Sequence, residues 1–375
     1  MSQIFKFQTN FVPDPTVPQI FKDRVHNWYR YGESNLYPQY ITELYNKSSL
    51  NRRCIQAKSY AAFGEGLRTL DPNLEYVLGK ANPYESWNDV FEKVVLDYVI
   101  YGGFAINVIW NKTGDKIIDF YHVQFADIRS DDFDPATDRV EWYYYCTDWT
   151  RYKKHKPIKY KNFNPDEAIE YPSQIFYWFD YAPGNRFYPL PTYSGSATDI
   201  QLNIELSTYH LSNISNGLSP SLWINFNGGQ PDALQQAALY QEISSAFSGV
   251  QNAGKFFMTF SNSKDDAPDI TPLQSVNDEY YINVLDMVRS SILTGHGISS
   301  PLLLGIRDQV GGGLGSNKDE MTIAWNQFME SVIKPMTKAL LKPMDRLMFY
   351  SGYNTKLYVE PLKPYEAAQV STATL

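Results

Sequence analysis

Cysteine, histidine and long apolar runs are all scarce in this chain of 375 residues. Two cysteines, Cys54 and Cys146, are too few for a disulfide scaffold and are typical of a protein that stays in a reducing cytosol. No apolar run approaches the roughly 20 residues that a membrane-spanning helix needs, so we expect no membrane partner. The first residues also lack a basic segment followed by an apolar one, so the sequence predicts no secretion signal.

The usual signatures of a metal site or an enzyme are missing as well. The histidines are far apart, and none is paired with a cysteine or a carboxylate at the spacing of a metal site: His26, His122, His155, His210 and His296. The acidic doublets at 131–132 and 265–266 lie in turn-rich sequence, which favours solvated loops over a cation site. No nucleophile elbow and no Cys–His motif occurs. We therefore predict no catalytic residue, no metal and no cofactor.

Positive charge is in deficit, since the formal net charge is −8. Proteins that bind duplex DNA tightly are normally basic, because counterion release from the phosphates drives that affinity. An acidic chain is a poor candidate for static DNA binding, although DNA could still slide along its surface. One basic cluster is a nucleic-acid contact or a solvated loop that balances acidic neighbours, and we favour the loop: Arg151, Lys153, Lys154, Lys156, Lys159 and Lys161.

Tyrosine, by contrast, is abundant, with 29 residues in a chain that is 15% aromatic. Tyrosine combines a large contact area with a polar tip and is enriched in subunit interfaces. A sheet-rich core and surface would explain the same composition, and the two interpretations are about equally good.

Helix signals precede strand signals in the N-terminal half. After a proline-rich stretch that we expect to be extended, helices are predicted to begin at Asn35–Pro38, near Ser48 and at Ser86. Ser86 and Asp89 have the spacing of a capping box. Aromatic-rich strands are predicted over 104–110, 116–123, 140–146 and 174–179, the first two as a hairpin. This half is therefore α+β with a mostly antiparallel sheet.

From residue 196 onward the pattern changes to long helices with thin apolar stripes. The helix over 196–216 has the stripe Ile200, Ile204, Leu211 and Ile214, and its partner over 273–295 has the stripe Tyr281, Leu285, Val288 and Ile292. Stripes this thin cannot bury a monomer's core on both sides, so we expect packing against neighbouring subunits. An insert between the two helices is predicted to contain strands over 221–227 and 254–261 and a helix over 231–248.

A glycine-rich loop over 311–317 follows, and it leads into a long helix interrupted by Pro335. The loop is not a phosphate-binding loop, because Lys318 comes late, no hydroxyl residue follows it and no strand precedes it in a βαβ unit. We interpret it as a pliable hinge.

Five stretches, in this order, carry a resemblance to a known family. They are Asn35-Leu36-Tyr37-Pro38 before a helix that ends at Gly64-Glu65-Gly66, the helix-to-strand step 97–105, and the stretches 247–255, 297–306 and 332–335. Together they resemble the portal proteins of tailed bacteriophages, from about Asn35 to Met348. The resemblance implies an α+β portal fold with an α/β wing, a two-helix stem, a small α/β clip inserted between the stem helices, and a long kinked C-terminal helix.

The resemblance also divides the chain. It implies an N-terminal arm (1–34), a wing (35–195), two stem helices (196–217 and 273–296), a clip (218–272), a tunnel-loop region (297–317), a long helix (318–350) and a short C-terminal segment (351–375). Because that last segment is short, any crown would be minimal.

Two sets of binding residues follow from the resemblance. The tunnel loop would face DNA with Arg307, Gln309, Gly311, Gly312, Gly313, Ser316, Asn317 and Lys318. The clip would pair strands between neighbouring subunits, with Trp223, Phe226, Lys255 and Phe257 at its interface.

Portal proteins form a dodecameric ring at one capsid vertex, through which a separate terminase motor pumps double-stranded DNA. We therefore expect a homo-oligomeric ring of 12 subunits that is assembled in the host cytoplasm and located in the virion. Its expected partners are the terminase large subunit, the major capsid protein, a head–tail adaptor and double-stranded DNA without sequence preference. Two alternatives stay open: an aromatic-rich carbohydrate-active enzyme, which would need two carboxylates in a cleft, and another ring or tail-tube protein of a phage particle.

Overall fold

The computed structural model describes residues 18–137, 139–215, 222–226, 231–232, 234–239, 241, 256–260, 278–306 and 318–362. The chain forms two compact units, residues 1–200 with 290–375, which we call the body, and residues 201–289, which we call the insert unit. Helices α4 (Ala197–Ser215) and α6 (Asp278–Gly295) each pass from one unit into the other. None of the helices that the structure describes is long and apolar enough to span a bilayer.

Three helices begin the body, and their ends follow the predicted signals: α1 (Tyr37–Lys47), α2 (Ser49–Phe63) and α3 (Trp87–Tyr101). The hydroxyl of Ser86 accepts from the backbone N–H of Asp89, and the Asp89 carboxylate accepts from that of Ser86, so the capping box is confirmed. Helix α3 ends at Gly102, whose φ of 82° is left-handed. A side chain at Gly102 would also meet the carbonyl oxygen of Leu190, because a Cβ there would lie 2.7 Å from it.

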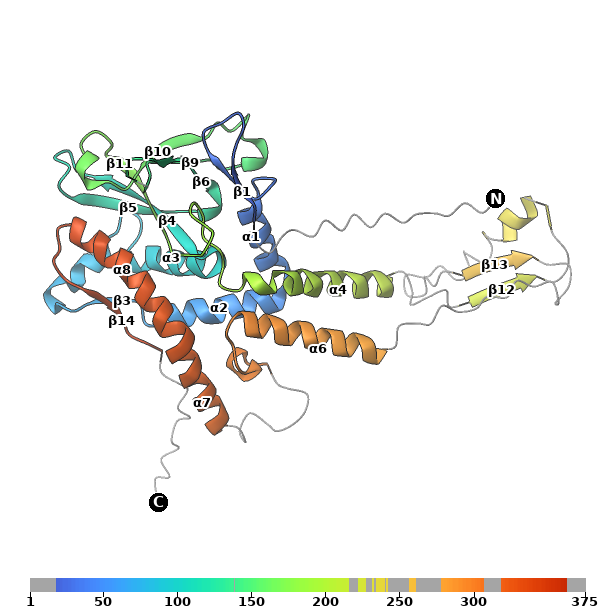
Figure 1. Ribbon diagram of the computed structural model, residues 1–375. Coiled ribbons are helices and arrows are strands. Elements are labelled where there is room, and N and C mark those ends of the chain that lie inside the picture. The colour runs from blue at the N-terminus through green and yellow to red at the C-terminus, as the bar shows by residue number, and fades with distance from the viewer. Residues whose placement is uncertain are drawn as a thin grey trace, which may run out of the picture. The chain divides into compact units, whose positions relative to one another are not determined.

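The centre of the body is a six-stranded sheet in the order β5-β4-β11-β10-β9-β6. Its strands are β4 (Gly103–Trp110), β5 (Ile117–Val123), β6 (Ile128–Ser130), β9 (Trp142–Tyr145), β10 (Ile158–Asn162) and β11 (Ser173–Phe179). Only β10 and β11 pair in parallel, so the predictions of a mostly antiparallel sheet and of the β4–β5 hairpin are confirmed. Helix α3 packs against one face of β4 and β5, where alternate residues such as Ile106 and Val108 are fully buried (Figure 1).

Three short strand pairs surround the sheet. Strand β1 (Ile20–Lys22) pairs with β2 (Tyr29–Tyr31), β7 (Phe133–Asp134) with β8 (Arg139–Val140), and β3 (Leu67–Thr69) with β14 (Leu357–Val359), all antiparallel. The extended arm predicted up to residue 34 is wrong for residues 20–31, which form a hairpin. Residues 1–17 of that arm lie outside the described residues.

The long C-terminal helix is continuous across Pro335 rather than broken by it. Helix α7 (Lys318–Phe328) runs through a π-helical turn (Met329–Ile333) into α8 (Lys334–Tyr350). A proline has no N–H to donate, and its ring clashes with the carbonyl four residues earlier, here that of Ser331. The wider π turn relieves that clash, which is why the predicted interruption takes this form.

The insert unit contains most of α4 and α6 and a pair of strands. Strands β12 (Leu222–Phe226) and β13 (Phe256–Phe260) are parallel, with Trp223 opposite Phe257. Both lie within the two predicted strands, and residues 234–239 and 241 are helical as predicted. In this unit the rings of Tyr209 on α4 and Tyr281 on α6 stack at 5.6 Å, and their hydroxyls hydrogen-bond at 2.8 Å.

Candidate functional site

The residues predicted to face DNA belong to a loop of which the structure describes the two flanks. Arg307, Gln309, Gly311, Gly312, Gly313, Ser316 and Asn317 lie outside the described residues, and Lys318 is the first residue of α7. The N-terminal flank runs from the end of α6 to Ile306 and includes the short 3₁₀ helix η6 (Pro301–Leu304). The C-terminal flank is α7, which packs against η6, followed by the π turn, which packs against α2.

His296 fastens the N-terminal flank to α2. Its side chain is buried, its Nε2 hydrogen-bonds with Oδ1 of Asn51 at 2.8 Å, and its ring stacks on that of Tyr193 at 4.5 Å. The Tyr193 hydroxyl in turn donates to the carbonyl of Ile100 at the end of α3. The turn after α6 is therefore held by α2 and α3 together.

Arg53 provides a second attachment of the same flank to α2. Its Nε donates to the carbonyl of Leu304, the last residue of η6, at 3.2 Å. Ser300 caps η6 at the other end by accepting from the backbone N–H of Leu302, and Gly305 ends it with a left-handed φ of 72°. These bonds fix the first part of the predicted tunnel-loop region (297–317), before Arg307.

The first turn of α4 and the last turns of α6 meet closely inside the body. The Ser196 hydroxyl donates to the carbonyl of Ser291 at 3.0 Å, and the Ser291 hydroxyl donates to the Asp199 carboxylate at 2.5 Å. A Cβ on Gly295 would lie 2.1 Å from the Ser196 hydroxyl oxygen, so the contact requires a glycine there. Gly295 is also the last residue of α6, where the predicted helix ends.

A buried lysine, Lys58, influences the protonation of His296. Lys58 is buried, and burial lowers its pKa to about 8. Its ammonium donates to the Thr192 hydroxyl at 3.3 Å, and it forms no ion pair among the described residues. Burial, together with the charge of Lys58, holds the pKa of His296 well below its ordinary value. His296 is thus neutral at pH 7 and acts as a structural pin rather than as a proton donor.

Half of the basic cluster is engaged in ion pairs. Lys159 pairs with Asp131 at 2.9 Å, Lys161 with Glu167 at 2.8 Å, and Arg151 with Asp148 at 2.6 Å. These pairs support the interpretation that the cluster balances acidic neighbours. Lys159 and Lys161 lie on β10, however, so the prediction of a loop is wrong for them. Lys153, Lys154 and Lys156 are exposed in the preceding turn.

The predicted clip residues lie on or next to paired strands. Trp223 and Phe226 belong to β12 and Phe257 to β13, while Lys255 lies outside the described residues. The two strands pair with each other within one chain, whereas the sequence analysis expects pairing between subunits. A two-stranded sheet has two free edges, so pairing within the chain leaves an edge for a neighbour.

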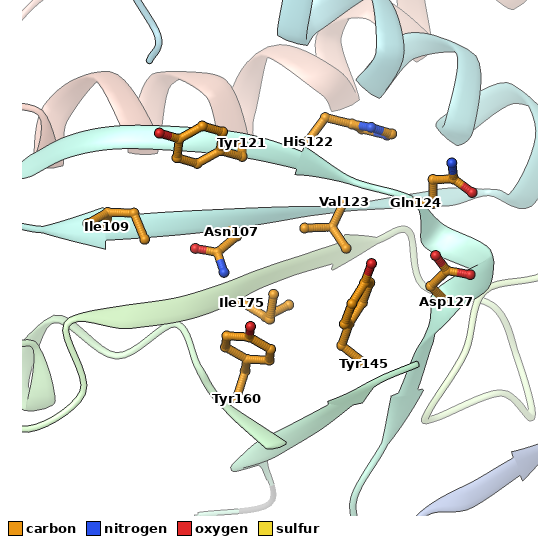
Figure 2. A pocket seen from close by; sticks show the side chains of 10 residues that line it. All are labelled: Asn107, Ile109, Tyr121, His122, Val123, Gln124, Asp127, Tyr145, Tyr160 and Ile175. Atoms are coloured by element: carbon orange, nitrogen blue, oxygen red, sulfur yellow. The ribbon is translucent and has the colours of Figure 1, made fainter. Parts of the chain in front are cut away.

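The sheet face opposite α3 has an open hollow of about 410 Å³ (Figure 2). It crosses five strands and the turn after β5, and it is lined by Asn107, Ile109, Tyr121, His122, Val123, Gln124, Asp127, Tyr145, Tyr160 and Ile175. His122 points to Asp97, with its Nε2 2.8 Å from the carboxylate. Among the described residues no three acidic, histidine or cysteine side chains gather where a metal ion could be held.

Sequence reasoning missed both the cluster around Lys58 and the hollow. The sequence does contain a signal for the cluster around Lys58. One face of the predicted helix carries two polar residues among apolar ones: Asn51, Cys54, Ile55 and Lys58. For the hollow, alternation along the predicted hairpin puts Asn107, Ile109, Tyr121 and Val123 on one face. Nothing in the sequence shows that this face is left partly uncovered.

The comparison with protein-family models assigns this architecture to a class. Residues 55–371 match the model described as phage portal protein. This match covers most of the chain, so the chain belongs to the phage portal protein family, as its sequence motifs suggested. Members of this family are structural proteins, which confirms that the chain is not an enzyme and removes the carbohydrate-active alternative.

Solved structures match over most of the chain as well. A chain in the "Neck of native GTA particle computed with C12 symmetry" is 15% identical with a TM-score of 0.56, covering 86% of this chain and 84% of that chain. One in the "Neck of empty GTA particle computed with C6 symmetry" is 16% identical with a TM-score of 0.58, covering 87% and 85%. One in the "Virion of native gene transfer agent (GTA) particle" is 14% identical with a TM-score of 0.57, covering 87% and 85%. These likenesses show a shared mixed α+β fold. No curated protein matches the chain.

Proposed function

We propose that this portal family member forms a closed ring of 12 copies at one capsid vertex of a phage particle. The ring is a channel for packaging and ejecting double-stranded DNA and a docking site for the terminase large subunit and a head–tail adaptor, and it is held by the major capsid protein. Family membership supports the proposal. So does the fold shared with chains in particle necks, two of them computed with C12 and C6 symmetry.

The observation that carries ring formation is the exposure of large apolar side chains on the two helices of the insert unit. Leu211 on α4 and Ile282, Leu285 and Met287 on α6 are between 36% and 65% exposed. Leu285 and Met287 are two residues apart on α6 and therefore point to different sides of the helix. Exposed apolar side chains on more than one side suit a subunit that contacts a neighbour on each side. A contact between unlike faces of identical copies gives a ring when the rotation between neighbours closes and an open filament when it does not. The shared fold with chains in particle necks favours closure.

The parts implied by the resemblance fit the described elements. The wing is the sheet with α1–α3 and α8, the stem is α4 with α6, the clip is the region of β12 and β13, and the tunnel loop joins η6 to α7. The stripes on the stem support this division, because Ile200 and Ile292 are buried in the body while Leu211 and Leu285 are exposed in the insert unit. Along each helix, the exposure of these apolar stripe residues therefore increases from the body to the insert unit.

The charge of the chain suits passage of DNA rather than retention of it. With a formal charge of −8, a ring of such chains is acidic overall and does not attract duplex DNA through its net charge. Each phosphate that a lysine or arginine neutralises firmly adds affinity and would slow translocation. Contact at the tunnel loop, which is nearly neutral, is therefore transient in this proposal.

The test is the mass and shape of the purified protein. Native mass spectrometry and electron microscopy across protein and salt concentrations should find closed rings with a central channel. Rings with another subunit number would keep the channel and change only the stoichiometry. Monomers alone under all conditions would refute the proposal.

A further inference from the structure

The hollow on the sheet face has a chemistry that sets it apart from the rest of the body surface. Its lining includes the aliphatic side chains of Ile109, Val123 and Ile175 with the amide of Asn107 among them, and Tyr145 and Tyr160 lie together on the β9–β10 side (Figure 2). The only carboxylate in its lining belongs to Asp127, in the short 3₁₀ helix η2 (Phe125–Asp127) after β5. An apolar site with aromatic rings and one carboxylate suits a cation that carries apolar neighbours.

Asp127 interacts with one nearby charge of opposite sign, that of Arg129, which lowers the pKa of Asp127 in part. Its carboxylate makes no hydrogen bond and no ion pair with the described residues, while its backbone carbonyl accepts from Cys146 and Trp149. Burial raises the pKa of Asp127 to about 6, and burial together with the charge of Asp127 raises that of Tyr145. The carboxylate is therefore partly desolvated, which favours pairing with an incoming ammonium or guanidinium group.

Arg129 acts on Asp127 through its charge alone, without an ion pair or a hydrogen bond between the two side chains. The Arg129 guanidinium is fully buried, and it donates instead to the carbonyls of Ala126, Ile128 and Asn35 and to the side chains of Asn35 and Gln39. All five of its N–H groups are engaged in this way. A cation that pairs with Asp127 must therefore come from elsewhere.

The chain itself supplies a segment that matches the hollow. Its first 13 residues contain one ionisable side chain, Lys6, and it stands between Phe5 and Phe7 and after Ile4. A single cation flanked by apolar side chains is the complement of a single carboxylate flanked by tyrosines and aliphatic residues. Such a segment would otherwise expose three large apolar side chains to water.

The arm is also long enough to reach the hollow. The described chain begins at Pro18, and β1 pairs with β2, which packs against β6 at one edge of the same sheet. The 12 residues from Lys6 to Pro18 span up to about 40 Å when extended. Strands are spaced roughly 4.8 Å apart, so the six-stranded sheet is only about 25 Å wide.

We propose that residues Ile4–Phe7 of each chain occupy the hollow of their own sheet, with the Lys6 ammonium on the Asp127 carboxylate and Phe5 and Phe7 against the tyrosines and the aliphatic side chains. The hollow is thus a binding site for the chain's own N-terminal segment. This site is independent of ring formation, since all of its residues belong to the body of one chain.

Photocrosslinking of the full-length protein tests the proposal. A benzophenone amino acid placed at Phe7 should crosslink to peptides that contain residues of β4, β5, β9, β10 or β11, mapped by mass spectrometry. Lys6→Glu or Asp127→Asn should lower the yield at least fivefold, and the exchange Lys6→Glu with Asp127→Lys should restore it. The control Asp166→Asn removes an exposed carboxylate elsewhere and should leave the yield unchanged.

Three results would overturn the proposal. The first is crosslinking elsewhere or none, and the second is a yield that Asp127→Asn leaves intact. Asp127→Asn should fold normally, because burial already disfavours the charge that it removes, and thermal unfolding checks this. The third concerns a mixture of isotopically heavy and light chains: crosslinks within one isotope support the chain's own arm, and crosslinks between isotopes would assign the hollow to a neighbour's arm instead.

Discussion

Lys58 is a buried cation without a buried counter-ion among the described residues, and this makes it a source of instability. Taking an ammonium out of water is costly unless a carboxylate or several acceptors replace the lost hydration. The Thr192 hydroxyl is a single acceptor. The pKa of Lys58 falls from 10.5 to about 8. Because one pKa unit corresponds to about 1.4 kcal/mol, this shift reflects the free-energy cost of keeping the buried ammonium charged.

Lys58→Met should therefore stabilise the body, by about 2–3 kcal/mol in the free energy of unfolding at pH 7. Methionine keeps the length of the side chain and removes the charge. The gain should shrink as the pH rises from 8 to 10.5, because the unfolded chain holds the proton over that window and the folded chain does not. Denaturant titration of both proteins measures the difference.

The control for Lys58→Met is Lys80→Met, an exposed lysine in the body, which should change the free energy of unfolding by no more than about 0.5 kcal/mol. A loss of stability in Lys58→Met would show that Lys58 has a counter-ion in the assembled protein.

His296 should make the body sensitive to mild acid. Its folded pKa lies well below the ordinary 6.5, so below pH 6.5 the unfolded chain binds a proton that the folded chain excludes. The contribution of His296 to the free energy of unfolding is fully present above pH 6.5 and is lost as the pH falls toward its folded pKa. His296→Gln should flatten the slope of unfolding free energy between pH 7 and 5. An identical slope in the two proteins would contradict the assignment.

At the scale of elements, local signals predicted helix ends better than they predicted strands. The Ser86 and Asp89 pair and the glycine at 102 act within a few residues, so the sequence shows them directly. Strand β10 could not be predicted, because three of its five residues are Lys159, Lys161 and Asn162, and its place depends on partners far along the chain, including Asp131 and Glu167. The hollow depends on the same long-range arrangement.

The loop between η6 and α7 should face the channel. A photocrosslinker on Val310→Cys should attach to DNA held in packaged particles, because the bonds from Arg53 and His296 to the preceding flank direct the chain to this point. Both native cysteines are buried, so the introduced thiol is the reactive one. The control Lys154→Cys places the same reagent in the exposed basic turn. Attachment from position 154 and not from 310 would put the DNA path elsewhere.

The insert should be separable from the body. Deleting residues 218–272 and joining α4 to α6 through a short glycine linker should abolish DNA packaging while the body unfolds at an unchanged denaturant concentration. The reason is that the contacts of the body core lie outside 201–289. Packaging by the shortened protein would refute the clip assignment, and loss of the body fold would refute the division into two units.

For the molecule as a whole, ring closure should depend on the apolar surface of α6. Ile282→Asp combined with Met287→Asp should shift the protein from rings to monomers at micromolar concentration, because each carboxylate would have to be buried in the contact. The control is Asn283→Asp, which adds one negative charge at an exposed polar position of the helix and should leave rings intact. Analytical ultracentrifugation distinguishes the two states, and intact rings in the double variant would place the contact elsewhere.

One pairing in the body has a consequence for how the protein is made. Strand β3, at residues 67–69, takes its partner β14 from residues 357–359, and α8 packs against α2. Contacts between residues so distant in sequence form late, because the intervening chain must first be synthesised and closed into a loop. A nascent chain therefore keeps an incomplete body until its last fifth leaves the ribosome. Since α4 begins in that body and α6 ends in it, we expect copies to associate after synthesis rather than on the ribosome.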